Sequence, residues 1–350
     1  MQIEKFTNLY RDVTKEGTKI PQEKYCLTGQ FPIVDQGQRV IAGWWNDDAG
    51  IFKNVPAIIF GDHTRAIKYM EQPFFIGADG VKILRPTNIK DNPKYLYYAL
   101  QAAKIPNLGY SRHFKVVKEL QICIYSRDEQ NEIVRVLEKI DYLIEQRHAE
   151  TTYLDQLVKS RFIELFGEPE LNPRDLPVLP WGAVFQTTTG KLDSNAMVEN
   201  GRYPFFTCAK ESYKIDSYAF DCEALLLAGN NAAGIYDVKH YKGKFNAYQR
   251  TYVLRLMNEK WSYILFKRQL EDKLRYLQSQ SKGTNTRYLT LGILNELRFV
   301  VPPIAEQEQF AAFVEQTDKS KYYSSLSFRY CQAAANTYRQ EWMTCRTSDF

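Results

Sequence analysis

Long apolar runs are absent from this sequence. No stretch approaches the roughly 18–20 consecutive apolar residues that a membrane-spanning helix needs, and the N-terminal MQIEKFTNLYRDV lacks the apolar core of a signal peptide. Cysteine is also sparse, because the six cysteines are scattered over 350 positions without a C-x-x-C pair. These absences predict a cytoplasmic protein with reduced thiols and no contact with membranes.

The motifs of common catalytic sites are missing as well. Gly190-Lys191 resembles the end of a phosphate-binding loop, but position 185, where that loop needs another glycine, is Phe. No G-x-G-x-x-G occurs, and the four histidines never fall at metal-ligand spacing. LNPRD (171–175) lacks the N-P-P-aromatic signature of amino-methyltransferases, and Asp237-Val238-Lys239 imitates only half of a nuclease site. The chain is therefore predicted to bind a partner rather than to catalyse, with no cofactor or metal of its own.

The composition is that of a globular protein. It is 44% hydrophobic and 25% charged, and 350 residues suffice for two domains of ordinary size, each with its own core. The net charge is +5, with a pI of about 8.7. This surplus suits a polyanionic partner, but it is too mild to identify one.

One segment occurs twice. RDEQNEIVRVLEKID (127–141) and IAEQEQFAAFVEQTD (304–318) share a Glu-Gln pair followed by an apolar helical period. The similarity extends over both halves of the chain, in which runs of period two and turns rich in Gly, Pro, Asn and Asp predict mostly β structure. The matched pairs are GQFPIVDQ (29–36) with GRYPFFTC (201–208), PAIIFGDHTR (56–65) with EALLLAGNNA (223–232), and YSRHF (110–114) with NTRYL (285–289). The pattern predicts two related domains, and chance similarity between two β domains is the alternative.

The two helices are expected to pack on each other. The first carries an apolar seam at 3-4 spacing, interrupted by Arg147, Thr151 and Arg161, over about 38 residues or roughly 57 Å. The packing residues are predicted to be Ile133, Leu137, Ile140, Ile144, Leu154 and Val158 on the first helix and Phe310 and Val314 on the second. An antiparallel coiled coil with pseudo-twofold symmetry follows, and two independent helices, each on its own domain, are the alternative. The predicted fold class of the whole chain is α+β.

Polar and basic residues gather where the predicted strands end. Arg suits guanine, Asn and Gln suit adenine, and Lys, Thr and backbone N–H groups suit phosphates, so these loops carry the residue types that contact duplex DNA. For any single side chain, a solvated loop explains the pattern equally well. The candidate DNA contacts are Gln36, Gln38, Arg39, His63, Thr64, Arg65, Lys68, Arg112, His113, Lys191, Asn230, Asn231, Lys239, Lys242, Lys244, Tyr248, Gln249, Arg250, Lys282, Thr284, Asn285 and Arg287.

The order and spacing of these blocks resemble the specificity subunit of a Type I restriction-modification system. GQFPIVDQGQRVIAGW, IIFGDHTRAIKYMEQPFFIGADGVKIL and KELQICIYSRDEQNEIVRVLEKID are similar to the first target-recognition domain of that family and the helix after it. WGAVFQTTTGK and LRFVVPPIAEQEQF are similar to the start of the second recognition domain and the second helix. The segment TDKSKYYSSLSFRYCQAAANTYRQEW departs from the pattern, because it is poor in Leu and weak in heptad character.

The resemblance implies two target-recognition domains, at 1–125 and 168–303, followed by spacer helices at 126–167 and 304–350. It implies a non-catalytic subunit that reads a bipartite target in double-stranded DNA. The implied partners are two methyltransferase subunits and, through them, restriction subunits. S-adenosylmethionine, ATP and Mg are then expected in those partners and not in this chain.

Two other functions remain open at this point. A self-contained DNA-modifying enzyme would need catalytic motifs that the sequence lacks. A degenerate or orphan coiled-coil scaffold would keep the helices but bind DNA with little specificity. The target bases and their spacing do not follow from the sequence.

Overall fold

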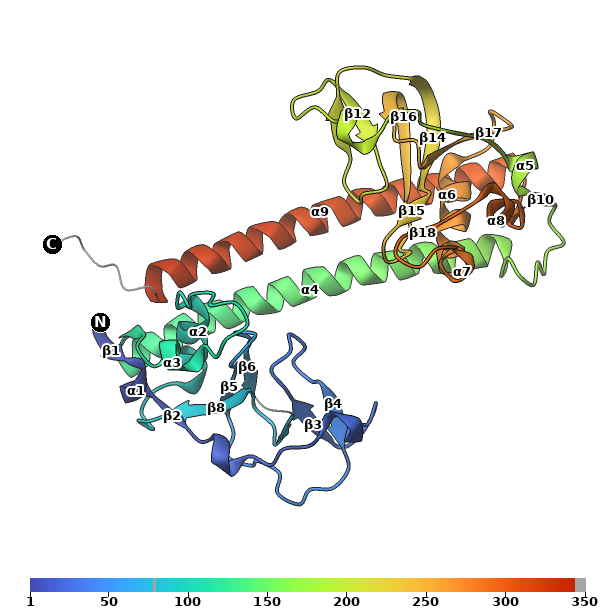
Figure 1. Cartoon of the computed structure of the whole chain (residues 1–350). Helices are drawn as coiled ribbons and strands as arrows, with labels where there is room; N and C mark the ends of the chain where they lie inside the picture. The colour runs from blue at the N-terminus through green and yellow to red at the C-terminus, as the bar shows by residue number, and fades with distance from the viewer. Residues whose placement is uncertain (78–79, 344–350) are drawn as a thin grey trace. The chain divides into compact units, whose positions relative to one another are not determined.

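The computed structural model describes residues 1–77 and 80–343, and its contacts divide the chain into two compact units (Figure 1). Unit 1 is Met1–Ala149 with Ser324–Phe350, and unit 2 is Glu150–Tyr323. The two long helices expected from the sequence are present as α4 (Arg127–Phe166) and α9 (Ile304–Met343). The sequence-based division gave each helix a segment of its own, whereas the contacts divide each helix between the two units.

Unit 1 is built on a four-stranded antiparallel sheet in the order β2-β8-β5-β6. Of its two inner strands, β5, with the sequence AIIFG, is buried at every residue. A second sheet has the order β4-β3-β7, and β1 pairs with β9. The strands are β1 (Gln2–Lys5), β2 (Tyr10–Asp12), β3 (Phe31–Val34), β4 (Gly43–Trp45), β5 (Ala57–Gly61), β6 (Ile67–Met70), β7 (Phe75–Ile76), β8 (Val81–Pro86) and β9 (Gln121–Ile124).

The helices of unit 1 complete its core. Besides its part of α4 and α9, the unit contains α1 (Phe6–Leu9), α2 (Pro93–Ala102) and α3 (Phe114–Val117). Asn92 caps α2, because its side chain accepts hydrogen bonds from the N–H groups of Lys94 and Tyr95. Tyr95 is buried with strand residues such as Phe60 in the main cluster of this unit.

Unit 2 repeats this plan. Its six-stranded sheet has the order β11-β17-β14-β16-β12-β13, and α6 packs against β14 and β16 (Figure 1). The strands are β10 (Val178–Pro180), β11 (Phe185–Thr189), β12 (Tyr203–Phe206), β13 (Tyr213–Ile215), β14 (Phe220–Ala228), β15 (Asn230–Asn231), β16 (Val238–Ala247), β17 (Thr251–Leu256), β18 (Arg287–Tyr288) and β19 (Arg298–Val300). The helices are α5 (Trp181–Val184), α6 (Tyr263–Asp272), α7 (Leu274–Gln280) and α8 (Leu291–Asn295), with part of α4 and α9.

The strand orders show that the repeat predicted from the sequence is structural. The order β11-β17-β14-β16 in unit 2 corresponds to β2-β8-β5-β6 in unit 1. The pairing of β10 with β19 corresponds to that of β1 with β9, and the parallel pair β12-β16 corresponds to β3-β7. The fold is therefore a duplicated α+β domain with two long helices.

The long helices contact each other in an antiparallel sense within each unit. In unit 1, Arg339 pairs with Asp141 at 3.1 Å, and the Ser324 hydroxyl donates to the Arg147 carbonyl. In unit 2, Lys321 pairs with Asp155, while the rings of Phe310 and Phe162 lie 5.6 Å apart. Within each unit, residues later in α4 therefore contact residues earlier in α9.

The predicted packing residues differ in burial. Ile133, Leu137, Val158 and Phe310 are buried, whereas Ile140, Ile144, Leu154 and Val314 are half-buried. Ile133 and Leu137 also lie in the main core of unit 1, with Phe6 and Met343. The seam at this end of α4 thus packs against a globular core as well as against α9. None of the described helices has the length and apolar character needed to cross a bilayer.

Candidate nucleic-acid interface

Three polar segments that are distant in the sequence come together in unit 1. They are the 35–39 turn after β3, the 62–65 turn after β5, and the 104–113 loop between α2 and α3. The Thr64 hydroxyl donates to the Gln36 carbonyl, and the His63 backbone N–H donates to Gln36 Oε1 at 3.3 Å. The 35–39 turn and the 62–65 turn therefore lie side by side in this unit.

His113 joins the second and third of these segments. It is fully buried, and its backbone N–H and ring Nδ1 both contact the Asp62 carbonyl at 2.9 Å. Its Nε2 accepts from the Leu108 backbone N–H at 3.1 Å, which assigns the ring proton to Nδ1. Both ring nitrogens are thus engaged inside the protein. The prediction that His113 contacts DNA is wrong, because its buried ring connects the 62–65 turn to the 104–113 loop inside the protein.

Lys68 is likewise internal. Only 4% of its surface is exposed, and its ammonium donates to the Asp35 carbonyl at 2.7 Å and to Asp35 Oδ1 at 3.4 Å. Burial lowers the pKa of Lys68, and the Asp35 carboxylate opposes that shift. The predicted DNA contact of Lys68 is therefore also corrected, because the ammonium anchors the 35–39 turn to β6.

Arg65 is held partly by the protein. It takes the left-handed backbone conformation with φ 61°, and one guanidinium nitrogen donates to the Ile105 carbonyl at 3.2 Å. This bond is a further tie between the 62–65 turn and the 104–113 loop. Gln38, Arg39 and Arg112 are exposed at the edges of the same surface.

Unit 2 joins the corresponding segments by a short strand pair. In β15 and β18, Asn230 lies opposite Tyr288 and Asn231 lies opposite Arg287. The Gly229 carbonyl accepts from the Leu289 N–H at 2.8 Å, as the Asp62 carbonyl accepts from His113 in unit 1. The turn after the buried strand and the loop after the helix therefore meet in both units, as the sequence repeat predicts.

A second turn of unit 2 lies beside this strand pair. The Gly229 N–H donates to the Arg250 carbonyl at 2.8 Å, and the Gln249 N–H donates to the Leu192 carbonyl at 2.9 Å. These bonds place Lys191, Tyr248, Gln249 and Arg250 next to Asn230 and its neighbours. Gly190 permits this approach, because a Cβ at that position would lie 1.8 Å from the Ala247 carbonyl oxygen.

Two predicted lysines lie outside this cluster. Lys242 is opposite Glu223 in the β14-β16 register and pairs with it at 3.1 Å, while Lys244 is opposite Asp221 and lies over the Tyr218 ring. Glu223 precedes the Ala228 end of β14 by five residues, or roughly 17 Å of strand. Lys239, nearer that end, pairs with Asp237 and donates to the Ala209 carbonyl. These three ammonium groups are thus already engaged by the protein to different degrees.

The exposure of the remaining candidates is graded. Lys191, Gln249, Arg250, Lys282, Thr284, Asn285 and Arg287 are exposed, whereas Gln36, His63, Thr64, Arg65, Asn230, Asn231 and Tyr248 are half-buried. Each unit therefore presents one composite polar surface, which we call the reading surface of that unit. In unit 1 it consists of residues 35–39, 62–65 and 104–113, and in unit 2 of residues 190–192, 229–231, 248–250 and 281–289.

Comparison with known proteins places the chain in a family. The family model described as Type I restriction modification DNA specificity domain matches the chain twice, over residues 10–153 and 176–322. The chain belongs to this family. The two matches lie in the two halves that the sequence repeat and the strand orders relate, so the specificity domain is present in duplicate.

Individual relatives agree with this assignment. The Type I restriction enzyme EcoDI specificity subunit of Escherichia coli is 35% identical over 153 residues, which are 43% of this chain. The chain spans only 33% of the length of that relative. The Type-I restriction-modification system S subunit from M. genitalium matches 99% of this chain and 96% of its own at TM-score 0.68 and 15% identity.

A solved structure that describes the complex assembly and conformational transition of the type I R-M system also matches this chain. It covers 95% of this chain and 97% of its own at TM-score 0.51 and 14% identity. At such identities, the likeness to the solved structures shows the fold alone.

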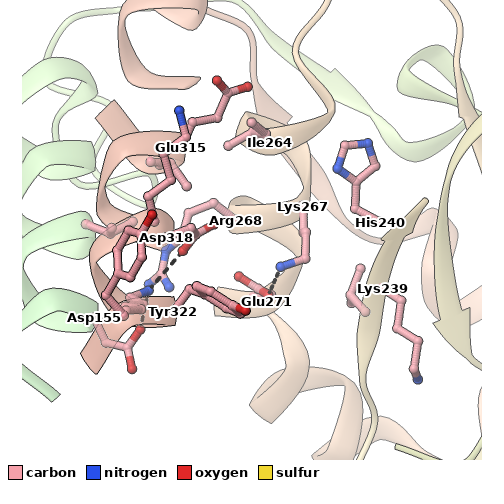
Figure 2. A pocket seen from close by; sticks show the side chains of 16 residues that line it. Asp155, Lys239, His240, Ile264, Lys267, Arg268, Glu271, Glu315, Asp318 and Tyr322 are labelled. Carbon is pink, nitrogen blue, oxygen red and sulfur yellow. Dashed lines mark hydrogen bonds and ion pairs between the residues drawn. The ribbon is translucent and has the colours of Figure 1, made fainter. Parts of the chain in front are cut away.

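Unit 2 of this specificity-domain protein also contains a polar groove of about 970 Å³ (Figure 2). Its charges are largely satisfied by neighbours, because Lys267 pairs with Glu271 at 2.7 Å and Lys321 pairs with Asp155 at 2.6 Å. Within residues 1–77 and 80–343, no three His, Cys, Asp or Glu side chains gather as metal ligands. The groove thus offers paired charges and contributes no candidate DNA contact besides Lys239.

Tyr110 belongs to the reading surface of unit 1 but was not among the residues predicted from the sequence. It is 95% exposed, and its ring stacks on that of His63 with centroids 5.2 Å apart and planes 17° apart. The available signal was its position two residues before Arg112, in the repeated block YSRHF. An aromatic residue in that block was equally consistent with a core position.

Proposed function

We propose that this chain is the DNA sequence-specificity subunit of a Type I restriction-modification complex. The observation that carries the proposal is the presence of two reading surfaces, one in each copy of a DNA specificity domain. Each surface would contact one half of a bipartite target in double-stranded DNA. The chain itself would be non-catalytic.

The two reading surfaces suit different half-sites. Unit 1 presents Gln36, His63 and Arg112, whereas unit 2 presents Asn230, Asn231 and Arg287. Amide side chains suit adenine and guanidinium groups suit guanine in the major groove. Because the frames are alike and the side chains differ, the two halves would read different bases with the same architecture.

The long helices are the proposed docking site of two methyltransferase subunits. In unit 1, α4 exposes Tyr142 and Leu143, with exposed fractions of 58% and 37%. In unit 2, α4 exposes Tyr153 and Leu157, and α9 exposes Tyr322 and Tyr323. Large apolar side chains on a helix surface are typical of a protein interface. Restriction subunits would join through the methyltransferases, and S-adenosylmethionine, ATP and Mg would belong to those partners.

The helices would also set the distance between the half-sites. A helix of 40 residues, the length of α4, extends roughly 60 Å, which exceeds the ~34 Å of one turn of DNA. Bases between the half-sites would then be spanned without being read. A cytoplasmic location would follow from this function, since the DNA that such a complex modifies lies there.

A domain exchange tests the proposal. Residues 1–125 are replaced by the first domain of a related subunit of known target, and methylated motifs are mapped in a host that supplies the methyltransferase subunits. One half of the motif is expected to change and the other to stay. The reciprocal exchange of residues 168–303 is the matched control and should change the other half. If a single exchange altered both halves, or if the unmodified complex methylated no bipartite motif, the proposal would fail.

A further inference from the structure

The stacked pair of Tyr110 and His63 is the most prominent aromatic feature of the reading surface in unit 1. Tyr110 gains little from burial, since 95% of its surface is exposed. His63 is half-buried, and its Nδ1 is enclosed without a hydrogen-bond partner among the described residues.

The loop that carries Tyr110 is held in one conformation by its own hydrogen bonds. Asn107 Oδ1 accepts from the Gly109 N–H at 3.1 Å, and the Ser111 hydroxyl donates to the Leu108 carbonyl at 2.8 Å. Gly109 takes φ 67°, a left-handed conformation that glycine adopts without strain. The turn is thus built around Tyr110, whose side chain points out of it.

This turn is fastened to the body of unit 1 through Asp62 and His113. The Asp62 carboxylate accepts from the Phe114 N–H at 2.7 Å, and the Asp62 carbonyl accepts from the His113 N–H. His113 Nε2 in turn holds the Leu108 N–H. Since Asp62 precedes His63 and Leu108 lies two residues before Tyr110, one buried imidazole fixes both rings of the stack.

The surroundings of the pair favour an anionic partner. Residues 104–118, with the sequence KIPNLGYSRHFKVVK, contain four Lys or Arg side chains and no Asp or Glu. Arg112 is exposed two residues after Tyr110, and Lys104 is exposed at the base of the loop. An exposed, pre-ordered aromatic ring beside cationic side chains pays little conformational entropy on binding, as in interface hot spots.

We propose that Tyr110 is a specificity-determining residue, whose side chain contacts a base edge of the first half-site. His63 supports its ring, and His113 is a positioning residue for both. The Tyr110 ring can pack on a thymine methyl group, and its hydroxyl can hydrogen-bond a base. This inference rests on the proposed function. The sequence repeat aligns Tyr110 with Asn285, so the second unit would present an amide at the corresponding position.

The test compares Tyr110→Ala and Tyr110→Phe with the unmodified protein, each assembled with the methyltransferase subunits. The probe is a DNA library that carries every base at each position of the first half-site. We expect Tyr110→Ala to lower discrimination at one position by roughly 10- to 100-fold and to leave the second half-site unchanged. Tyr110→Phe should keep discrimination if the ring makes the contact, and lose it if the hydroxyl does. Either result with Phe supports the inference.

The matched control is Ile89→Ala, which removes an apolar side chain that is 96% exposed in the same unit but outside the reading surface. It should leave the motif unchanged. Positioning by His113 is tested with His113→Gln, which should broaden the same position as Tyr110→Ala. A purely structural loss would instead reduce methylation at all sites alike. Thermal unfolding and assembly are checked for every variant.

Three results would overturn the inference while leaving the proposed function intact. They are an unchanged motif in Tyr110→Ala, a uniform loss of binding at every sequence, and a change in the second half-site only. The second of these would identify a phosphate contact. If the unmodified complex showed no bipartite motif, the proposed function would fail and this inference with it.

Discussion

At the residue scale, the repeated Glu-Gln pair has a structural role that its sequence pattern did not disclose. Gln130 is buried, and its Oε1 accepts from the Asn92 N–H at 2.7 Å while its Nε2 donates to the Tyr125 carbonyl. Gln307 is buried too, and its Oε1 accepts from the Ser262 N–H at 3.0 Å. Asn92 and Ser262 are the N-caps of α2 and α6, so each glutamine fastens a long helix to the N-terminus of one shorter helix, α2 in unit 1 and α6 in unit 2.

The glutamates before them have diverged. Glu129 accepts from the N–H and hydroxyl of Ser126, a capping box that lowers the pKa of its carboxyl group. Glu306 instead pairs with Arg174 at 2.7 Å, and the hydrogen bond from that guanidinium lowers its pKa. The glutamine is thus the member of the pair whose contacts are the same in both units.

Replacing either glutamine should destabilise its own unit. Gln130→Leu and Gln307→Leu each remove the acceptor of a half-buried backbone N–H and the donor to a carbonyl. Two hydrogen bonds are lost, at a cost of about 1–3 kcal/mol in the free energy of unfolding. Hydrogen exchange would report faster opening at the start of α2 in the first variant and of α6 in the second. Gln146→Leu, at an exposed position of α4, is the control and should change stability by less than about 0.5 kcal/mol. If all three variants lowered the free energy of unfolding equally, the proposed role of the two buried glutamines would be refuted.

Buried tyrosines should make unit 1 sensitive to alkali. Burial raises the pKa of Tyr10, Tyr69, Tyr95 and Tyr98. A tyrosine in the unfolded chain loses its proton near pH 10, so above that pH the unfolded state binds fewer protons than the folded state. The contribution of these protonated tyrosines to the free energy of unfolding is complete below about pH 10. It falls as the pH rises towards the pKa values of the folded state.

The measurement is the free energy of unfolding against pH from 8 to 12, with tyrosinate absorbance recorded in parallel. Tyr95→Phe lowers stability at neutral pH, because it removes the hydroxyl hydrogen bond to the Cys123 carbonyl at 2.6 Å. The same variant should make the decline above pH 10 shallower. A slope unchanged by Tyr95→Phe would exclude this tyrosine from the alkaline transition.

At the element scale, α4 and α9 change character along their length. Their buried apolar residues are at the ends that pack on a domain core, such as Leu137 in unit 1 and Phe310 in unit 2. Towards the middle of each helix the contacts are polar, as in the Lys321 to Asp155 pair and the Ser324 to Arg147 bond. Polar contacts at such positions specify register more than they contribute to stability.

Lengthening both helices should therefore change spacing and not recognition. Four residues inserted after Ala149 in α4 and four after Tyr323 in α9 add about one turn, or roughly 6 Å, to each helix. At ~3.4 Å per base pair, the gap between methylated half-sites should grow by about two base pairs while the bases read stay the same. Methylation mapping in the assembled complex measures the gap.

Insertion into α4 alone is the control, since it shifts one helix against the other and should impair folding or assembly. Circular dichroism must show unchanged helix content in the double insertion. Given a folded and assembled protein, an unchanged gap would disprove the role of the helices as a spacer.

At the scale of the whole molecule, charge is too modest for strong DNA binding by the chain alone. The net charge is +5, and ammonium groups such as Lys239 and Lys242 already have carboxylate partners. Non-specific binding grows with the number of phosphates neutralised and weakens steeply with salt. Specific binding would therefore depend on the assembled complex, in which partner subunits add contacts.

The isolated chain should bind a duplex with the target no tighter than micromolar at physiological salt. Addition of the methyltransferase subunits should strengthen binding to that duplex far more than to a scrambled duplex of the same length. Fluorescence anisotropy titrations at several salt concentrations measure both affinities. Nanomolar, sequence-specific binding by the chain alone would contradict the expectation.

Local sequence patterns predicted the duplicated α+β plan, the positions of the two long helices, and the loops that form each reading surface. These features depend on local periodicity and on turn chemistry, which are properties of short segments. The repeat supplied a second copy of each signal, so that PAIIFGDHTR and EALLLAGNNA could be matched as strands followed by a polar turn.

Which polar side chains are exposed to a partner depends on contacts between segments that are distant in the sequence. His113 and Lys68 have the residue types and positions of DNA contacts, yet contacts with Asp62 and Asp35, distant in the sequence, enclose them. Tyr110 has the residue type of a core position, yet the closed turn from Asn107 to Ser111 directs it outward. Burial depends on what the folded chain brings from elsewhere, and no local pattern contains that information.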